Sequence, residues 1–164
     1  MSKPTNIFTL MATCFPLGQM PKAPGTWGSL PGLLVGVGIF NLSQINGQLH
    51  PYVFATLLLL ILAGFSWWVI HKTEALWQSH DDKSIVIDEV AGQAIPLAFF
   101  SPSWQLVLAA FVLFRFFDIS KPLFIGWADK KVHGSFGTLL DDLFAGMVVL
   151  GLFVLDSMTM QWLP

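Results

Sequence analysis

The stretch that decides the fold is residues 52–70, YVFATLLLLILAGFSWWVI, in which no residue is charged. Its length matches the roughly 20 apolar residues with which a helix crosses the hydrocarbon core of a bilayer. No Asp, Glu, Lys or Arg occurs from Ala23 to His71, so the uncharged region is longer than one such helix. Residues 52–70 therefore predict a membrane span, and the residues before them leave room for another.

The composition of the whole chain agrees with this prediction. Hydrophobic residues make up 54% of the 164 residues, and charged residues only 11%. A soluble domain of this size needs more charged surface, so we expect an all-α integral membrane protein with one domain over 1–164. The net charge of −2 argues against general binding to nucleic acid. The single cysteine, Cys14, excludes an internal disulfide and a metal site of several cysteines.

Three further apolar regions predict the rest of the bundle. Leu30–Ile45, entered after Pro31, and Leu143–Leu163 are long enough to cross, or nearly cross, a bilayer. Residues 90–117 are also apolar, but Pro96 and the segment 101–103 interrupt them. This region predicts either two thin spans or a hairpin that enters the membrane and returns. The expected fold is a compact bundle of about four to five transmembrane or re-entrant helices.

The basic residues indicate which way the bundle faces. When the spans are threaded in order, Lys22, residues 72–89 and residues 115–142 all fall on one side of the membrane. Every basic residue then lies on that side, which the positive-inside rule identifies as cytoplasmic. Asp156 is the acid that falls toward the other side. Charged segments that are far apart in the sequence are thus expected to share one membrane face.

Two acid pairs open apolar helices on that face. Asp88-Glu89 precedes the uncharged region 90–114, and Asp141-Asp142 precedes the last span. Carboxylates at a membrane boundary are costly unless they are paired or bind a cation. Because oxygen ligands favour Mg²⁺ over softer metals, the two pairs predict a shared magnesium site. The simpler interpretations are that Asp81 or Asp82 caps a helix and that Glu89 pairs with a lysine. They are strong for Asp82 and weaker for Asp88 and Glu89.

Two segments carry candidate phosphate ligands. Lys22 precedes a helix start whose backbone N–H groups, together with Thr26 and Ser29, are suited to binding phosphate. Simple helix capping explains Thr26 and Ser29 equally well. Arg115 and Asp118 share a helix face. Either Arg115 holds a phosphate while Asp118 binds metal, or the two form an ion pair.

Two other segments, residues 28–36 and the loop before the second acid pair, contain informative glycines. Gly28, Gly32 and Gly36 recur every four residues, a spacing that favours close packing against another helix. Gly134 follows His133 in the loop before the second acid pair. His133 has the chemistry of a general acid or base, but a lone histidine is more often an ordinary surface residue.

Taken together and in order, four segments resemble the phosphatidylglycerophosphatase A family of bacterial membrane lipid phosphatases. The resemblance runs from Lys22 to the last helix. Ser135, Phe124 and the run 138–140 depart from the family pattern, and none of these departures removes a charged residue. The segments are Pro24–Ser29, Asp81 with Ile85–Glu89 and Gly92, Phe114-Arg115 with Asp118 and Lys121-Pro122, and Gly134, Gly137 and Asp141-Asp142 with Ala145-Gly146.

The resemblance implies Mg²⁺-dependent hydrolysis of phosphatidylglycerophosphate to phosphatidylglycerol and phosphate, a step in phospholipid biosynthesis. It implies a multi-pass protein of the bacterial inner membrane with a cytoplasmic active site, a phospholipid substrate in the bilayer and no evident obligate protein partner. Either water or an aspartate, through an aspartyl-phosphate, attacks the phosphorus. The implied catalytic acids are Asp81, Asp88, Glu89, Asp118, Asp141 and Asp142, all except Asp81 as metal ligands, and the phosphate-binding residues are Lys22, Thr26, Ser29, Arg115 and Lys121.

The main alternative is a small multi-pass transporter or channel subunit. Such proteins usually place ionisable groups along a path within the membrane. The first two predicted spans contain no charged residue, and the charges gather on one face. A purely structural membrane protein would leave two acid pairs at helix starts without a reason. The sequence therefore favours a lipid phosphatase.

Overall fold

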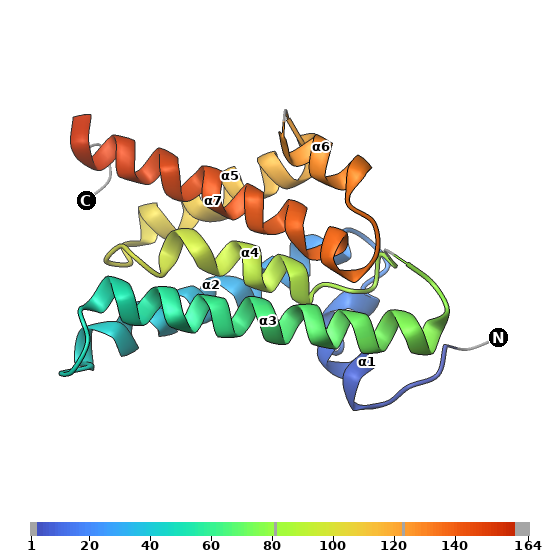
Figure 1. Ribbon diagram of the computed structural model, residues 1–164. Helices are drawn as coiled ribbons and strands as arrows, with labels where there is room; N and C mark the ends of the chain where they lie inside the picture. The colour runs from blue at the N-terminus through green and yellow to red at the C-terminus, as the bar shows by residue number, and fades with distance from the viewer. Residues whose placement is uncertain (1–2, 81, 123, 160–164) are drawn as a thin grey trace.

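The computed structural model describes residues 3–80, 82–122 and 124–159. Over these residues it is helical and contains no strand, as the sequence predicts (Figure 1). In chain order, the elements are α1 (Ile7–Ala12), the short 3-10 helix η1 (Leu17–Gln19), α2 (Pro24–Ile45), α3 (Pro51–Trp77), α4 (Ile87–Leu97), α5 (Trp104–Ser120), α6 (Phe124–Lys131) and α7 (Ser135–Thr159).

Three helices, α2, α3 and α7, are long and apolar enough to cross a membrane. The first predicted span was placed too late, because α2 begins at Pro24 and Pro31 lies inside it. A proline in the first turn removes no helical hydrogen bond and has the φ angle that a helix needs, so Pro24 suits a helix start. The predicted end of the last span at Leu163 lies outside the described residues.

The interrupted region 90–117 forms two helices joined by a bend, rather than one span. At 1.5 Å per residue, α4 is about 16 Å long and α5 about 25 Å, both shorter than the hydrocarbon core of a bilayer. Ser103 caps α5, since its Oγ accepts a hydrogen bond from the backbone N–H of Leu106 at 3.2 Å. Helix α4 lies in the middle of the bundle, against α2, α3, α5 and α7, and is almost wholly buried (Figure 1).

Glycines let α2 and α7 approach α4 closely. A Cβ atom on Gly32 would lie 2.7 Å from Cβ of Gln93, and one on Gly36 would lie 2.7 Å from the Ala94 carbonyl oxygen. The packing face predicted from the glycine repeat is therefore confirmed. On the other side of α4, a Cβ on Gly146 would lie only 2.2 Å from the Gly92 carbonyl oxygen. The backbones of α4 and α7 thus touch where these two glycines meet.

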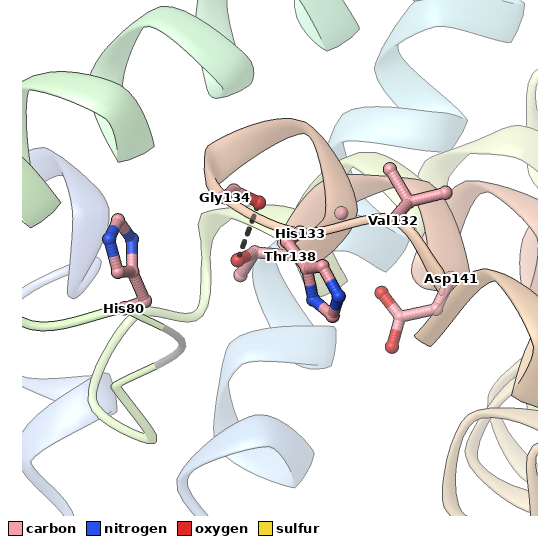
Figure 2. Close-up of a pocket in the computed structure, with 7 residues that line it drawn as sticks. His80, Val132, His133, Gly134, Thr138 and Asp141 are labelled. Atoms are coloured by element: carbon pink, nitrogen blue, oxygen red, sulfur yellow. Dashed lines mark hydrogen bonds between the residues drawn. The ribbon is translucent and has the colours of Figure 1, made fainter. Parts of the chain in front are cut away.

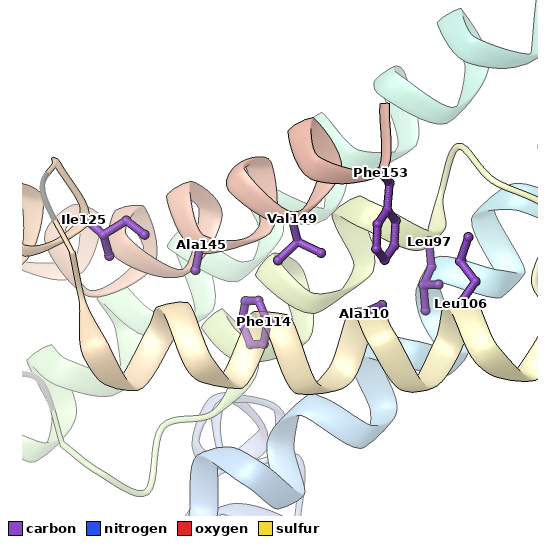
Figure 3. Packing of buried hydrophobic residues seen from close by; sticks show 8 residues of the cluster. All are labelled: Leu97, Leu106, Ala110, Phe114, Ile125, Ala145, Val149 and Phe153. Carbon is purple, nitrogen blue, oxygen red and sulfur yellow. The ribbon is translucent and has the colours of Figure 1, made fainter. Parts of the chain in front are cut away.

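Apolar side chains fill the space between α4, α5, α6 and α7. Phe114 is fully buried at the centre of this cluster, and Phe153 closes the end toward the α4–α5 bend (Figure 3). This packing holds the end of α5 beside the start of α7, so that their polar residues share one end of the bundle. The cluster comprises Leu97, Leu106, Ala110, Phe114, Ile125, Ala145, Val149 and Phe153.

Candidate active site

The two acid pairs meet at one end of the bundle. Carboxylate oxygens of Asp88, Glu89 and Asp142 all lie within 4.8 Å of one another. Asp88 lies four residues before Gly92, and Asp142 lies four residues before Gly146, so each acid sits one turn above the glycine contact on the same face. The close crossing of α4 and α7 therefore brings the acids together.

These acids line a pocket of about 200 Å³, called here the acid pocket. Asp118 at the end of α5 and Asp141 at the start of α7 also line it, so five of the six predicted acids are brought to one place. The sixth, Asp81, lies outside the described residues. The lining residues are Pro24, Asp82, Lys83, Ile85, Asp88, Glu89, Asp118, Lys121, Thr138, Asp141 and Asp142.

Two basic side chains balance part of this charge. Nη1 of Arg115 lies 2.6 Å from Oδ2 of Asp118 and 3.9 Å from Oε1 of Glu89. Nζ of Lys121 lies 2.6 Å from Oδ2 of Asp141. Arg115 is largely buried, so its ion pairs are shielded from water. The ion-pair interpretation of Arg115 and Asp118 is thus confirmed. Lys121 is among the described residues that line the pocket, whereas Arg115 lies behind Glu89 and Asp118 and is not.

Two carboxylate oxygens of Glu89 and Asp142 receive no hydrogen bond from the described residues. Within the part of the chain that the structure describes, Oε2 of Glu89 and Oδ1 of Asp142 are buried and accept no hydrogen bond. A buried anionic oxygen without a partner is costly, and three carboxylates this close repel one another. The candidate metal ligands are all carboxylate oxygens, which suit a hard divalent cation such as Mg²⁺. The residues present therefore fit the predicted metal.

The start of α2 contributes less to the pocket than the sequence predicts. Lys22 is exposed, Thr26 is half-buried, and neither is among the described residues that line the pocket. Ser29 is buried, and its hydroxyl donates to the Gly25 carbonyl at 2.8 Å and accepts from Nη1 of Arg115 at 3.4 Å. Ala23 caps α2 without a side-chain bond, so the capping explanation of Thr26 and Ser29 is wrong.

Asp82 lines the pocket, but it does not cap α4, whose N-cap residue is Val86. Its carboxylate accepts hydrogen bonds from Nζ of Lys3 and from the backbone N–H and hydroxyl of Ser84. Burial acts to raise the pKa of Asp82, but these hydrogen bonds outweigh it and hold the pKa below its usual value. The acid therefore fixes the loop before α4.

Glu74 is a buried acid that the sequence analysis missed. It lies in the last turn of α3 and is only 3% exposed. Its carboxylate accepts hydrogen bonds from the hydroxyls of Ser135, at 2.7 Å, and Thr138, at 3.3 Å. Glu74 thus fixes the first turn of α7, just before Asp141 and Asp142. A single carboxylate in the last turn of an apolar helix was the signal that could have identified it.

A second pocket, of about 390 Å³, adjoins the acid pocket through Thr138 and Asp141 (Figure 2). His80 and His133 lie on its walls, together with Asp141 (Figure 2). Nδ1 of His80 is 3.4 Å from Oε2 of Glu74. The α6–α7 loop, which contains His133 and Gly134, therefore forms part of the site's surroundings.

Cys14 does not offer an alternative nucleophile. Burial, with a smaller effect of the Glu89 charge, raises the pKa of its thiol to about 11. A thiol nucleophile reacts as the thiolate, which at neutral pH is then a very small fraction. The chemistry of the site must come from its oxygen and nitrogen groups.

Gly25 leaves the space that Glu89 occupies, and Gly25→Ala tests this. The new Cβ would lie 2.1 Å from Oε1 of Glu89 and 3.1 Å from Nη1 of Arg115. Because Oε1 ends a flexible side chain, the carboxylate should swing away without unfolding the protein. We expect phosphate release to fall about 10- to 100-fold, as when a group that orients a metal ligand is lost. The melting temperature should change little.

The matched control is Gly38→Ala on the same helix, where a Cβ meets nothing within 4 Å. Alanine is the better helix former, so this variant should keep both activity and stability. If the two variants had equal activity, the space that Gly25 leaves for the Glu89 carboxylate would not matter for the reaction.

Comparisons with known proteins identify the family of the chain. The family profile described as Phosphatidylglycerophosphatase A matches residues 10–156, a range that includes all six predicted site acids. A Haemophilus influenzae protein named Phosphatidylglycerophosphatase A is 42% identical over 143 residues, covering 87% of this chain and 83% of its own length. The Escherichia coli protein of the same name is 36% identical over 151 residues, covering 92% and 83%.

A third relative carries a different name. A Bacteroides thetaiotaomicron protein, provisionally named as a phosphatidylinositol-3-phosphatase, is 33% identical over 150 residues, covering 90% of this chain and 91% of its own length. No solved structure matches the chain at a significant level. The profile covers most of the chain, the acid pocket included, and two relatives share the family name at 36% and 42% identity. This membrane protein therefore belongs to the phosphatidylglycerophosphatase A family and is a phosphatase.

Proposed function

We propose that this chain hydrolyses phosphatidylglycerophosphate to phosphatidylglycerol and phosphate, with Mg²⁺ as cofactor, at the cytoplasmic face of the bacterial inner membrane. The observation that carries this proposal is the convergence of Asp88, Glu89 and Asp142 within 4.8 Å. Pro24 at the start of α2 and Asp142 near the start of α7 line the same pocket, so the pocket lies at the ends of candidate spans. A lipid head group can reach such a position while its acyl chains stay in the bilayer.

Asp88, Glu89 and Asp142 would hold the metal. When bound, Mg²⁺ would offset charge on the phosphate and lower the pKa of a coordinated water. The two donor-free oxygens of Glu89 and Asp142 support this assignment. Asp118 and Asp141 are each paired with a basic residue, so they serve first to orient those residues.

Arg115 and Lys121 would bind the terminal phosphate. The Arg115 guanidinium can donate two parallel hydrogen bonds to phosphate oxygens, whereas the Lys121 ammonium acts as a point charge. Lys121 lines the pocket itself, whereas Arg115 contacts two acids that line it, Glu89 and Asp118. Positive charge held in place before the reaction stabilises the charge that develops on the transferring phosphoryl group.

The reaction breaks the bond between phosphorus and the glycerol oxygen. Water attacks the phosphorus and gives up a proton to a pocket carboxylate, and the departing glycerol oxygen takes a proton to become the hydroxyl of phosphatidylglycerol. In the second route, an aspartate attacks first and water then hydrolyses the aspartyl-phosphate. Trapping of a phosphoryl-enzyme after acid quench separates the two routes.

The test is phosphate release by the purified protein in mixed micelles. Phosphatidylglycerophosphate, phosphatidate and phosphatidylinositol 3-phosphate are compared, each with Mg²⁺ and with a chelator. We expect release from phosphatidylglycerophosphate to be fastest and to require Mg²⁺. Faster release from either other lipid, or full release in chelator, would overturn the assigned substrate or metal. Solute flux in vesicles without phosphate release would favour a transporter.

A further inference from the structure

An apolar groove of about 800 Å³ runs between α2 and α5. Leu30, Leu34 and Val37 form the α2 wall, and Leu108 and Phe111 form part of the α5 wall. Leu34 is 76% exposed and Leu108 is 54% exposed, so the groove's rim is uncovered in the part of the chain that the structure describes. The groove is thus a hollow that an apolar ligand can enter from the side.

The groove begins beside the residues assigned to the phosphate. Leu30 follows Ser29 directly, and Phe111 lies four residues, or one turn, before Arg115. Ser29 and Arg115 are 3.4 Å apart, and Arg115 in turn contacts Glu89 and Asp118 of the acid pocket. Both walls of the groove therefore continue into the polar end of the site.

The lining residues also define the length of the groove. Trp104 begins α5 and, with Pro102 and Ser103, lines the end of the groove far from Arg115. From Leu30 to Val37, and from Trp104 to Phe111, each wall extends about 10 Å along its helix. A slot of this length fits the first part of an acyl chain.

We propose that this groove holds one acyl chain of the phospholipid whose terminal phosphate occupies the acid pocket, and that the lipid enters between α2 and α5. The inference rests on the proposed function. The surrounding bilayer is as apolar as the groove, so the chain gains little by leaving other lipids. The benefit of the groove is orientation, because an acyl chain held in it sets the direction from which the head group reaches Arg115.

The first experiment narrows the groove. Leu34→Trp and Leu108→Trp add bulk at exposed positions, where the fold should tolerate it. We expect KM for dioleoyl phosphatidylglycerophosphate to rise about tenfold, the effect of a lost pocket contact, with kcat retained. Leu60→Trp on α3, where Leu60 is equally lipid-facing at 64% exposure, is the matched control and should keep both constants.

Two further measurements exclude indirect effects. The deacylated head group, used as a competitive inhibitor, should keep its inhibition constant in both groove variants. A photoactivatable acyl chain on phosphatidylglycerophosphate should label residues 30–37 and 104–111, and excess unlabelled substrate, but not phosphatidylcholine, should prevent the labelling.

The outcomes separate this inference from the proposed function. If the wild-type protein releases phosphate but the groove variants keep the wild-type KM, the groove assignment is wrong and the function stands. Labelling that phosphatidylcholine prevents equally would show ordinary bilayer lipid in the groove. Crosslinking of position 34 to a second copy would show a protein interface there, which also overturns the proposal. Absence of phosphate release by the wild-type protein would overturn the function itself.

Discussion

Replacing Asp88, Glu89 or Asp142 by its amide counterpart (D88N, E89Q, D142N) is expected to reduce phosphate release at least about 100-fold, as loss of one essential charge-stabilising group does. The same substitutions should raise the melting temperature of the protein in chelator. Three carboxylates within 4.8 Å destabilise the cation-free protein by repulsion, and two of their oxygens lack donors. Removing the charge of Asp88 or Asp142 relieves this repulsion and should stabilise the cation-free protein. E89Q also loses the 3.9 Å contact with Arg115, so its melting temperature should rise less.

Thermal unfolding in detergent with and without Mg²⁺ measures both effects. The wild-type protein should melt at a higher temperature in Mg²⁺, because a ligand that binds only the folded state stabilises it. Each amide variant should lose most of this increase. Asp156→Asn, on α7 but outside the acid pocket, should behave as the wild type. Near-normal turnover in all three folded variants would rule out the site.

Gly146→Ala should damage both the fold and the active site. The added Cβ would lie 2.2 Å from the Gly92 carbonyl oxygen, which is backbone and cannot rotate away. Helices α4 and α7 must then separate, at a cost of about 1–3 kcal/mol for overpacking. Asp88 and Asp142 lie one turn from this contact, so the acids separate too. A displacement of about 1 Å is enough to lower turnover about 100-fold.

The comparison variant is Gly151→Ala on the same helix, where a Cβ meets nothing within 4 Å. It should match the wild type in melting temperature and in phosphate release. If Gly146→Ala keeps wild-type stability and turnover, the glycine contact does not position the acids.

The sequence predicts the membrane class and five of the acids that line the acid pocket, but not the contact that brings these acids together. Threading the spans was enough to bring the pairs Asp88-Glu89 and Asp141-Asp142 to one face. The touching point of Gly92 and Gly146 depends on how two helices cross, which no local pattern encodes. Lys22 was expected in the site because it is basic and near a helix start, whereas the structure leaves it exposed.

Glu74 shows a second limit of prediction from the sequence. Its neighbours in the sequence are ordinary for the end of a span, and its partners Ser135 and Thr138 lie more than 60 residues away, with separations of 61 and 64. A long-range hydrogen bond of this kind leaves no periodic signal. One of these partners, Ser135, is a residue that departs from the family pattern, so the pattern could not identify its bond to Glu74 either.

The position of the acid pocket at one end of α2, α3 and α7 makes the proposed reaction one-sided. A phospholipid in the far leaflet has its head group at the opposite surface, a full bilayer away from Arg115 and Lys121. The enzyme would therefore consume substrate from a single leaflet and return its product to that same leaflet. Any phosphatidylglycerol in the other leaflet must arrive there by a separate transbilayer movement.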